Sequence, residues 1–266
     1  MKLIVVPPYL NPVVDWQPVD RELLSNLEKK GQLKEVEVNI DEGYFIESPS
    51  ESRDEEFLAN ITIGIIRKVK EYSGKGEYDA IVIQGVLGPG FAAARAVSRI
   101  PVTGQIHSAI HMASLIGERF GVIHTVAPSS LIIKHRVEEY GFGHKLASVR
   151  FIGHSSTYLY RLIRTHQKEE RIKVPEIKKV IDDMTAQCIA AIEKERADSL
   201  IFGCEPLQIF EDEVRQSLDE SGYSEVPIIC ELSAGVEMAK AMVNIKLIQA
   251  AKAYPTAALK AKPEYW

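Results

Sequence analysis

The chain has 266 residues, of which 45% are hydrophobic and 26% charged, and its formal net charge is −5. This composition can bury a large core in one large domain or two smaller ones, and the basic residues form no stripe that would suggest a nucleic-acid partner. No apolar run approaches the roughly 18 residues that span a bilayer, so we expect no membrane association. The three cysteines lack the spacing of a disulfide framework and we expect no signal peptide, so the chain is predicted to be cytoplasmic.

Short aliphatic runs alternate with longer amphipathic segments along the whole chain. Strands are predicted at residues 2–7, 33–39, 79–84, 101–103, 119–124, 146–152, 198–203 and 226–230. Helices are predicted at residues 19–30, 54–73, 90–98, 107–118, 129–141, 175–196, 207–221 and 232–253. The stretches 39–53 and 153–172 are predicted to be loops. Such alternation indicates an α/β fold, with parallel sheets covered by helices on both faces.

An internal repeat divides the chain into two similar parts. Three pairs of segments match in the same order: KLIVV (2–6) with RFGVI (119–123), DAIVIQG (79–85) with DSLIFGC (198–204), and IPVTGQIHSAIHMA (100–113) with VPIICELSAGVEMA (226–239). We therefore predict two copies of one α/β unit. Residues 1–118, joined by 240–266, form the first half, and residues 119–239 form the second.

The repeat also predicts where a ligand would bind. Open parallel sheets bind ligands at the carboxyl ends of their strands, so two related halves that face each other should share a site in the cleft between them. Cys204 follows the strand at 198–203, and its counterpart in the first half is Gly85. A thiol from one half would therefore face a bare backbone position of the other.

Seven stretches, spread over nearly the whole chain, carry a resemblance to a known family. They are MKLIVVPP, YDAIVIQGVLGPG, IPVTGQIHSAIHMA, RFGVIHTVAPSS, YGFGHKLASVR, ADSLIFGCEPL and VPIICELSAGVEMAKAMV. On these motifs the chain resembles the aspartate/glutamate/hydantoin racemase superfamily, most closely its hydantoin racemase-like branch. The resemblance implies two flavodoxin-like halves related by a pseudo-twofold axis, an active site in the cleft between them, and chemistry without a cofactor.

In that family two cysteines normally remove and return the α-proton of a carbonyl compound. The resemblance maps the second of them onto Cys204 and the first onto Gly85. The loop that usually holds a substrate carboxylate corresponds to residues 7–11, read here as Pro-Pro-Tyr-Leu-Asn, and the usual Thr-Thr pair corresponds to His124 and Thr125. A thiol is suited to this work when its surroundings lower its pKa, which the start of the following helix can do.

Cys204 is thus the predicted principal acid/base, and His107 or His124 could replace the missing thiol because histidine titrates near neutral pH. His111 lies one turn beyond His107 and could share its face. The predicted substrate-binding residues are Pro8, Tyr9, Asn11, Gly85, Val86, Thr125 and Glu205. The glycine-rich loop 85–90 would offer backbone N–H groups to an anionic group. No spacing matches a metal-ligand motif, so we expect no metal.

Four functions remain open on these residues. The leading one is a racemase or epimerase acting at the α-carbon of a small carbonyl acid, amide or cyclic ureide. A single-cysteine decarboxylase or isomerase is the second, since arylmalonate decarboxylases resemble this pattern in having glycine at the first position. A hydrolase with Cys204 as nucleophile and His107 or His124 as base is the third. A relative that only binds a metabolite is the fourth. The partner expected in each case is a small molecule, and because relatives often form dimers or larger assemblies, a homo-oligomer is also an expectation.

Overall fold

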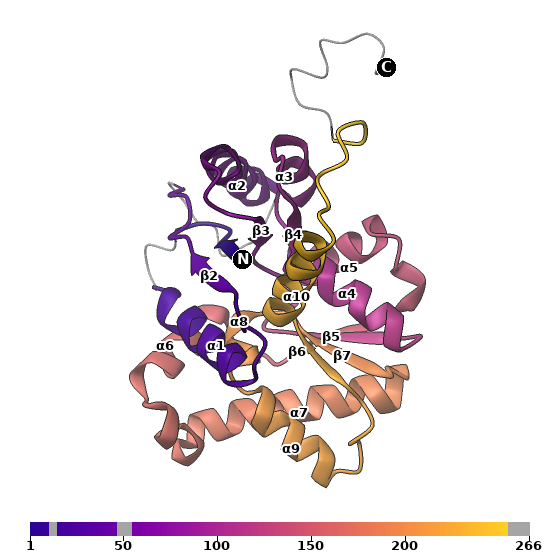
Figure 1. Ribbon diagram of the computed structural model, residues 1–266. Coiled ribbons are helices and arrows are strands. Elements are labelled where there is room, and N and C mark those ends of the chain that lie inside the picture. The colour runs from indigo at the N-terminus through magenta and orange to yellow at the C-terminus, as the bar shows by residue number, and fades with distance from the viewer. Residues whose placement is uncertain (11–14, 47–54, 255–266) are drawn as a thin grey trace.

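The computed structural model describes residues 1–10, 15–46 and 55–254 (Figure 1). Within them lie two parallel sheets of four strands. The first has the order β2-β1-β3-β4 and the second β6-β5-β7-β8. The strands are β1 (Lys2–Val6), β2 (Glu37–Ile40), β3 (Ala80–Ile83), β4 (Val102–Gly104), β5 (Phe120–His124), β6 (Leu146–Phe151), β7 (Ser199–Phe202) and β8 (Ile228–Cys230). The predicted α/β class with two similar parallel-sheet halves is confirmed.

The central strands are apolar because helices cover both of their faces. Every residue of β3, β5 and β7 is buried, and the four residues from Leu3 to Val6 of β1 are buried as well. Strands buried on both faces lose the alternation of apolar and polar residues, which is why the runs AIVI and SLIF stand out in the sequence.

Most helices lie where the sequence predicts them. These are α1 (Gln17–Lys29), α2 (Glu55–Lys75), α3 (Phe91–Val97), α4 (Gln105–Ile116), α5 (Ser130–Glu139) and α7 (Pro175–Glu195). The helix predicted at 207–221 is two elements, the one-turn α8 (Glu205–Gln208) and α9 (Glu211–Glu220), separated at the buried Phe210. The helix predicted at 232–253 is α10 (Glu231–Asn244). It ends early because Lys246 adopts a left-handed backbone (φ 60°) and the Leu247 N–H donates to the carbonyl of Met242 at 2.9 Å.

The loop prediction for 153–172 is wrong over its middle part, which forms helix α6 (Ser156–Thr165). The Ser155 side chain caps this helix by accepting a hydrogen bond from the Tyr158 N–H at 3.2 Å. Four of its residues are buried on one face: Leu159, Tyr160, Leu162 and Ile163. This apolar face docks α6 onto the core of the second half.

Helices α4 and α10 join the two halves. Each follows the last strand of its own sheet, and the two pack against each other, while α10 also contacts β3 and β4 (Figure 1). Gly235 permits the close approach, since a Cβ there would stand 2.9 Å from Val82 Cγ1. The half boundaries at residues 118 and 239 stay a prediction, and residues 255–266 of that prediction lie outside the described residues.

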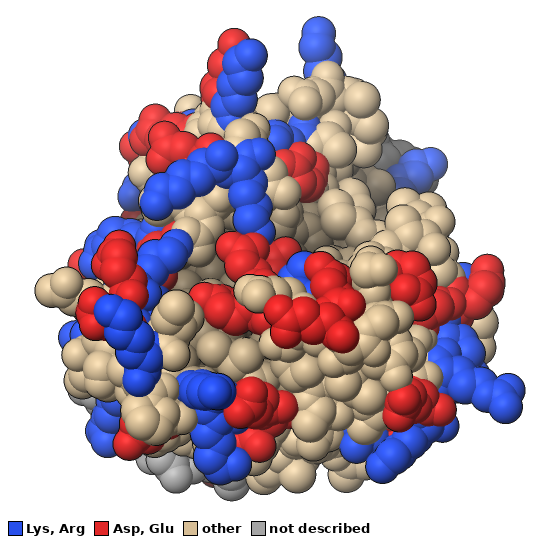
Figure 2. Space-filling view, turned by 90° about the horizontal axis from the view of Figure 1, so that it is seen from below, with Lys and Arg blue, Asp and Glu red and all other residues tan. Residues whose placement is uncertain are grey.

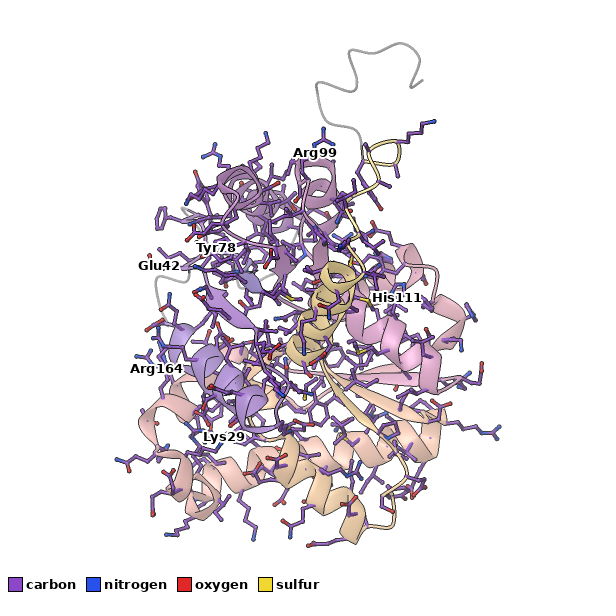
Figure 3. The ribbon with its side chains drawn as sticks, in the orientation of Figure 1. Lys29, Glu42, Tyr78, Arg99, His111 and Arg164 are labelled. Carbon is purple, nitrogen blue, oxygen red and sulfur yellow. The ribbon has the colours of Figure 1, made fainter. Side chains whose placement is uncertain are left out.

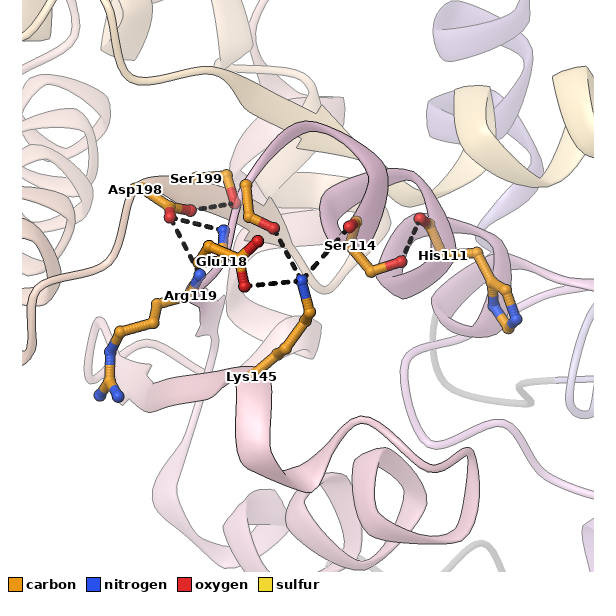
Figure 4. Close-up of polar contacts among 8 residues, drawn as sticks. His111, Ser114, Glu118, Arg119, Lys145, Asp198 and Ser199 are labelled. Atoms are coloured by element: carbon orange, nitrogen blue, oxygen red, sulfur yellow. Dashed lines mark hydrogen bonds and ion pairs between the residues drawn. The ribbon is translucent and has the colours of Figure 1, made fainter.

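In both halves an aspartate side chain accepts backbone N–H groups at the start of the first strand. Asp79 Oδ2 accepts the Lys2 N–H at 2.7 Å, and Asp198 Oδ2 accepts the N–H groups of Glu118 and Arg119 at 2.7 and 3.0 Å. Around the second of these, the Lys145 ammonium donates to two backbone carbonyls at the end of α4 and to the Glu118 carboxylate at 3.1 Å (Figure 4). The equivalent aspartates support a duplicated unit.

The surface carries both signs of charge. Figure 2 shows Lys and Arg side chains interspersed with Asp and Glu over the face that it presents. Among the described helices, none offers an apolar stretch of the length that crossing a membrane requires.

Candidate active site

A cavity with an empty volume of about 660 Å³, counted to its open mouth, lies between the carboxyl ends of the two sheets. Its lining includes residues that follow β1, β3, β5 and β7: Pro8, Gly85, Val86, Thr125, Gly203, Cys204 and Glu205. The strands of both halves therefore point their carboxyl ends at one cleft, as expected for an α/β ligand site.

Cys204 and Gly85 occupy equivalent places in this cleft. Each is the second residue after the third strand of its half, β7 for Cys204 and β3 for Gly85. Gly85 has φ +103°, a conformation that favours glycine, and a Cβ there would meet only Pro8 Cγ, at 4.0 Å. The first half thus presents open space where the second half presents a thiol.

The two turns interlock across the cleft. Val86 of the first half reaches over Gly203, where a Cβ would stand 2.8 Å from Val86 Cγ2. In return, the side chain of Gln84 lies close enough to the Glu205 carboxyl of the second half to affect its pKa. Val86 is equivalent to Glu205 in the repeat, and Gly203 is equivalent to Gln84. The two contacts are therefore related by the pseudo-twofold axis.

Polar side chains connect Cys204 to His124. The Cys204 Sγ lies 3.6 Å from Ser156 Oγ, which lies 3.4 Å from Thr125 Oγ1, and that hydroxyl lies 3.4 Å from His124 Nε2. His124 Nδ1 donates to the Gly203 carbonyl at 2.6 Å, because a carbonyl oxygen can only accept. In the neutral ring Nε2 is then the acceptor, so this chain can carry a proton away from the thiol.

Helix α8, which follows Cys204, provides less electrostatic stabilisation of a thiolate than the sequence suggested. Because α8 is a single turn, it has few aligned peptide dipoles to act on the thiol. The glycine-rich loop also has fewer available amides: the Gly85 N–H donates to Gln105 Oε1 at 3.1 Å, and the Gly88 N–H donates to the Gly85 carbonyl at 3.1 Å.

One wall of the cleft is aromatic. Trp16 stacks on Tyr160 with ring centroids 5.8 Å apart, and Tyr9 meets Trp16 and Phe57 edge-on at 4.8 and 5.5 Å. Trp16, Phe57 and Tyr160 line the cavity directly. This wall fits a flat or apolar group of a ligand.

Three carboxyl groups lie buried behind the cleft. Glu205 lines the cavity, Asp20 accepts a hydrogen bond from Gln84 Nε2 at 3.1 Å, and Glu231 is completely buried. Burial raises the pKa of all three, and their mutual repulsion raises the pKa of Asp20 and Glu231 further. Burial therefore favours the neutral form of all three groups.

A second cavity, of about 700 Å³ empty volume, lies on the other side of Trp16. Four acidic residues line it: Asp15, Asp20, Asp41 and Glu42. Asp41 is paired with Lys68 at 2.9 Å, whereas Asp20 Oδ2 has no hydrogen-bond partner among the described residues. Asp20 thus lies between this cavity and the cleft.

The structure brings most of the predicted site residues together. Pro8, Gly85, Val86, His124, Thr125, Cys204 and Glu205 line the cleft. Tyr9 stands behind the aromatic wall and lines the second cavity. Asn11 lies outside the described residues.

His107 lies away from the cleft. Its ring contacts Phe91, Tyr140 and His111, at centroid distances of 4.7, 4.8 and 4.2 Å. Burial lowers its pKa to about 3, with a further contribution from His111. Figure 3 places His111 on the side of α4 and α5, across the molecule from α1 and α6. Among the described residues, no three His, Cys, Asp or Glu side chains are placed to hold a metal ion.

Several residues of the cleft were not predicted from the sequence, notably Trp16, Phe57, Ser129, Ser156 and Tyr160. Ser156 and Tyr160 belong to α6, whose signal was the capping Ser155 followed by apolar residues at helical spacing. Trp16 immediately precedes α1 and Phe57 lies in the first turn of α2. No local sequence pattern indicates that these two residues reach the cleft.

Comparisons with known proteins agree with this architecture. A curated hydantoin racemase of Pseudomonas sp. (strain NS671) is 26% identical over 182 residues, and one of Rhizobium meliloti is 29% identical over 181 residues. Both alignments cover 68% of this chain but only 65% and 66% of the relatives, so the chain spans a little under two thirds of their length.

Solved structures share the fold. An allantoin racemase from Pseudomonas fluorescens superposes with a TM-score of 0.75 and 18% identity, covering 96% of this chain and 97% of that one. An allantoin racemase from Klebsiella pneumoniae gives 0.73 and 20%, covering 94% and 90%. A mutant of arylmalonate decarboxylase gives 0.53 and 12%, covering 92% and 94%.

The profile of one family, Asp/Glu/Hydantoin racemase, matches residues 26–239 of the chain. That span contains both interlocking turns, the whole of the second sheet, helix α4 and the first nine residues of α10. The chain belongs to the Asp/Glu/hydantoin racemase family.

Proposed function

We propose that the protein is a cofactor-independent racemase or epimerase that acts at the α-carbon of a neutral cyclic ureide or related amide, with Cys204 as acid/base. The observation that carries the proposal is a thiol in a cleft whose described lining contains no Lys or Arg. Family membership and the hydantoin racemase relatives support an isomerase.

The lack of a Lys or Arg in the described lining favours an uncharged substrate. A carboxylate moved from water into a mostly apolar cleft loses solvation, and a cation or several N–H groups must replace it. Here the polar groups are the hydroxyls of Thr125, Ser129 and Ser156, the His124 ring and the Glu205 carboxyl. Hydroxyl and acid groups suit the carbonyl and N–H edges of a ureide ring, while the aromatic wall suits its substituent.

Cys204 handles the α-proton in this proposal. A thiolate near the substrate removes the proton from one face, and the adjacent carbonyl of the ring accepts the resulting charge as an enolate. The chain through Ser156 and Thr125 gives the thiol proton a route to the ring of His124.

A second candidate is a single-thiol decarboxylase, which the glycine at position 85 favours. Such an enzyme needs only one acid to deliver a proton after loss of CO2. Its malonate substrate, however, carries two negative charges, and the described lining of the cleft offers no cation to hold them.

Solvent deuterium separates these functions. Enantiopure 5-benzylhydantoin incubated with the protein in D2O is expected to lose optical rotation and its C5 hydrogen together, well above the rate without protein. Release of CO2 from an arylmalonate, with deuterium only in the product and no reaction of the hydantoin, would establish the decarboxylase instead. Ring opening without exchange would establish a hydrolase.

A thiol added at Gly85 should raise the racemisation rate. Both Gly85→Cys and Gly85→Ala strain the backbone at φ +103°, at a cost of about 1–3 kcal/mol, so their comparison isolates the sulfur. The open space in front of the turn accommodates either side chain. We expect Gly85→Cys to exceed Gly85→Ala at least about 10-fold in hydantoin racemisation, within the range of one acid/base group. Equal rates in two folded variants would contradict the twofold mapping.

A further inference from the structure

A racemase must deliver or remove a proton on both faces of the substrate carbanion. Cys204 serves one face, and the equivalent position on the other side is Gly85, which has no side chain. If the proposed function holds, another group must serve the face toward the first half. His107 lies in an aromatic cluster away from the cleft, and His124 is coupled to Cys204 on the second-half side.

We propose that the Glu205 carboxyl is the second acid/base group of this site, serving the face toward the first half, and that Asp20 connects it to the second cavity and so to solvent. This inference rests on the proposed racemase activity and assigns the group that replaces the missing thiol.

The position of Glu205 carries the first part of the proposal. Although Glu205 follows Cys204 in the chain, its carboxyl lies near the side chain of Gln84, the first-half neighbour of Gly85. The thiol instead contacts Ser156 of the second half. Glu205 lines the cleft, and its Oε1 has no hydrogen-bond partner among the described residues. A buried polar atom without a partner at the wall of a cleft is available to a ligand.

The protonation states of the two groups are complementary. Burial raises the pKa of Glu205, which favours the protonated carboxyl that the proposal needs beside a Cys204 thiolate. In one direction the thiolate takes the C5 hydrogen as a proton and forms S–H, while the Glu205 O–H proton passes to the opposite face and forms the new C–H bond. The enzyme is left with a thiol and a carboxylate, and the reverse direction uses this second state.

After each turnover a proton must leave the thiol and another must return to Glu205. Gln84 Nε2 donates to Asp20 Oδ1 at 3.1 Å and holds this carboxyl close enough to Glu205 for the charge of Glu205 to raise the pKa of Asp20. Asp20 lines the second cavity together with Asp15, Asp41 and Glu42, and Figure 3 shows Glu42 beside β2, above α1. In the proposed route this cavity supplies solvent protons to Asp20, whose Oδ2 has no hydrogen-bond partner among the described residues.

Exchange without inversion tests the assignment. Each enantiomer of 5-benzylhydantoin is incubated in D2O with the wild type, Glu205→Gln and Cys204→Ala, and both C5 deuterium and chirality are followed. We expect Glu205→Gln to lose racemisation about 10²-fold or more while one enantiomer still exchanges its C5 hydrogen with retention. Cys204→Ala should show the same pattern for the other enantiomer.

The matched control is Glu231→Gln, which makes the same change at a buried carboxyl that lines neither cavity. It should racemise at the wild-type rate. If Glu205→Gln racemises like the wild type, or loses exchange of both enantiomers equally, the inference is wrong. If the wild type itself neither exchanges nor racemises the hydantoin, the proposed function fails and the inference with it.

Asp20→Asn tests the proton route. Because the return of the proton occurs on the free enzyme, its slowing should lower kcat about 10-fold and leave kcat/KM within about twofold of the wild type. A purely structural role for Asp20 would lower kcat/KM as well, and that result would remove Asp20 from the route.

Discussion

Replacing Cys204 by alanine should lower hydantoin racemisation about 10³-fold, within the range observed for removal of a general acid/base. In the proposed mechanism the thiol takes the proton on the second-half face, and the hydroxyls of its neighbours Ser156 and Thr125 are far weaker acids than a thiol. Polarimetry under saturating substrate, with circular dichroism to confirm the fold, measures the effect.

Cys204→Ser refines this result. Serine keeps the size of the side chain and can hydrogen-bond Ser156, but its hydroxyl is far less acidic than a thiol. A loss as large as that of alanine would therefore identify ionisation of the sulfur, and not its packing, as the source of the rate.

Cys230→Ala is the matched control for a thiol. Cys230 ends β8, the strand beside β7, but is not among the residues that line the cleft. Burial raises its pKa, so it remains a neutral thiol. Its replacement should leave the rate within about twofold of the wild type, and a racemase that survives Cys204→Ala but not Cys230→Ala would contradict the assignment.

The fold could be predicted because its signals are local. All eight strands lie within or next to the predicted runs, since strands buried on both faces are continuous apolar segments that periodicity detects. The repeat then placed Cys204 opposite Gly85 without any coordinates, because equivalent strands of a duplicated unit must end at the same cleft.

The rest of the site depends on distances that sequence spacing does not contain. Trp16 and Tyr160 are 144 positions apart in the chain, yet their rings stack and form one wall. His107 follows β4 near the carboxyl edge, which suggested a place in the cleft, but the helical turn of α4 directs it toward Phe91 and Tyr140. The sequence alone does not show which way a side chain near the start of a helix points.

The carboxyl cluster was the least visible feature in the sequence. Asp20, Glu205 and Glu231 each begin or lie near the start of a helix, where an acidic residue usually faces solvent and favours the dipole. Only the packing of α1, α8 and α10 behind the cleft shows that all three are buried.

Replacing Glu231 by glutamine should stabilise the protein relative to the wild type increasingly from pH 5 to pH 8, by up to about 1.4 kcal/mol for each pH unit. Glu231 is completely buried, and neither of its carboxyl oxygens has a hydrogen-bond partner among the described residues. Burial and the repulsion of Glu205 therefore raise its pKa well above the ordinary value of 4.5.

The sign follows from the protons bound in each state. Above the ordinary pKa the unfolded chain releases the proton of Glu231, whereas the folded chain keeps it until the pH reaches the raised value. The folded state binds more protons in this window, so the free energy of unfolding falls with rising pH, by about 1.4 kcal/mol per pH unit for one carboxyl. Glutamine resembles the neutral carboxyl in shape but has no proton to lose, so the variant lacks this slope.

Urea unfolding at pH 5, 6, 7 and 8 measures the difference between the two stability curves. Glu237→Gln on the same helix is the control, since Glu237 forms a surface ion pair with Lys240 at 2.8 Å and its loss should cost less than about 1 kcal/mol throughout. Parallel curves for Glu231→Gln and the wild type would mean that Glu231 is ionised in the folded protein. Diverging curves would instead show that the fold keeps a neutral acid behind the cleft at a cost in stability, the same condition that the proposed role of Glu205 requires.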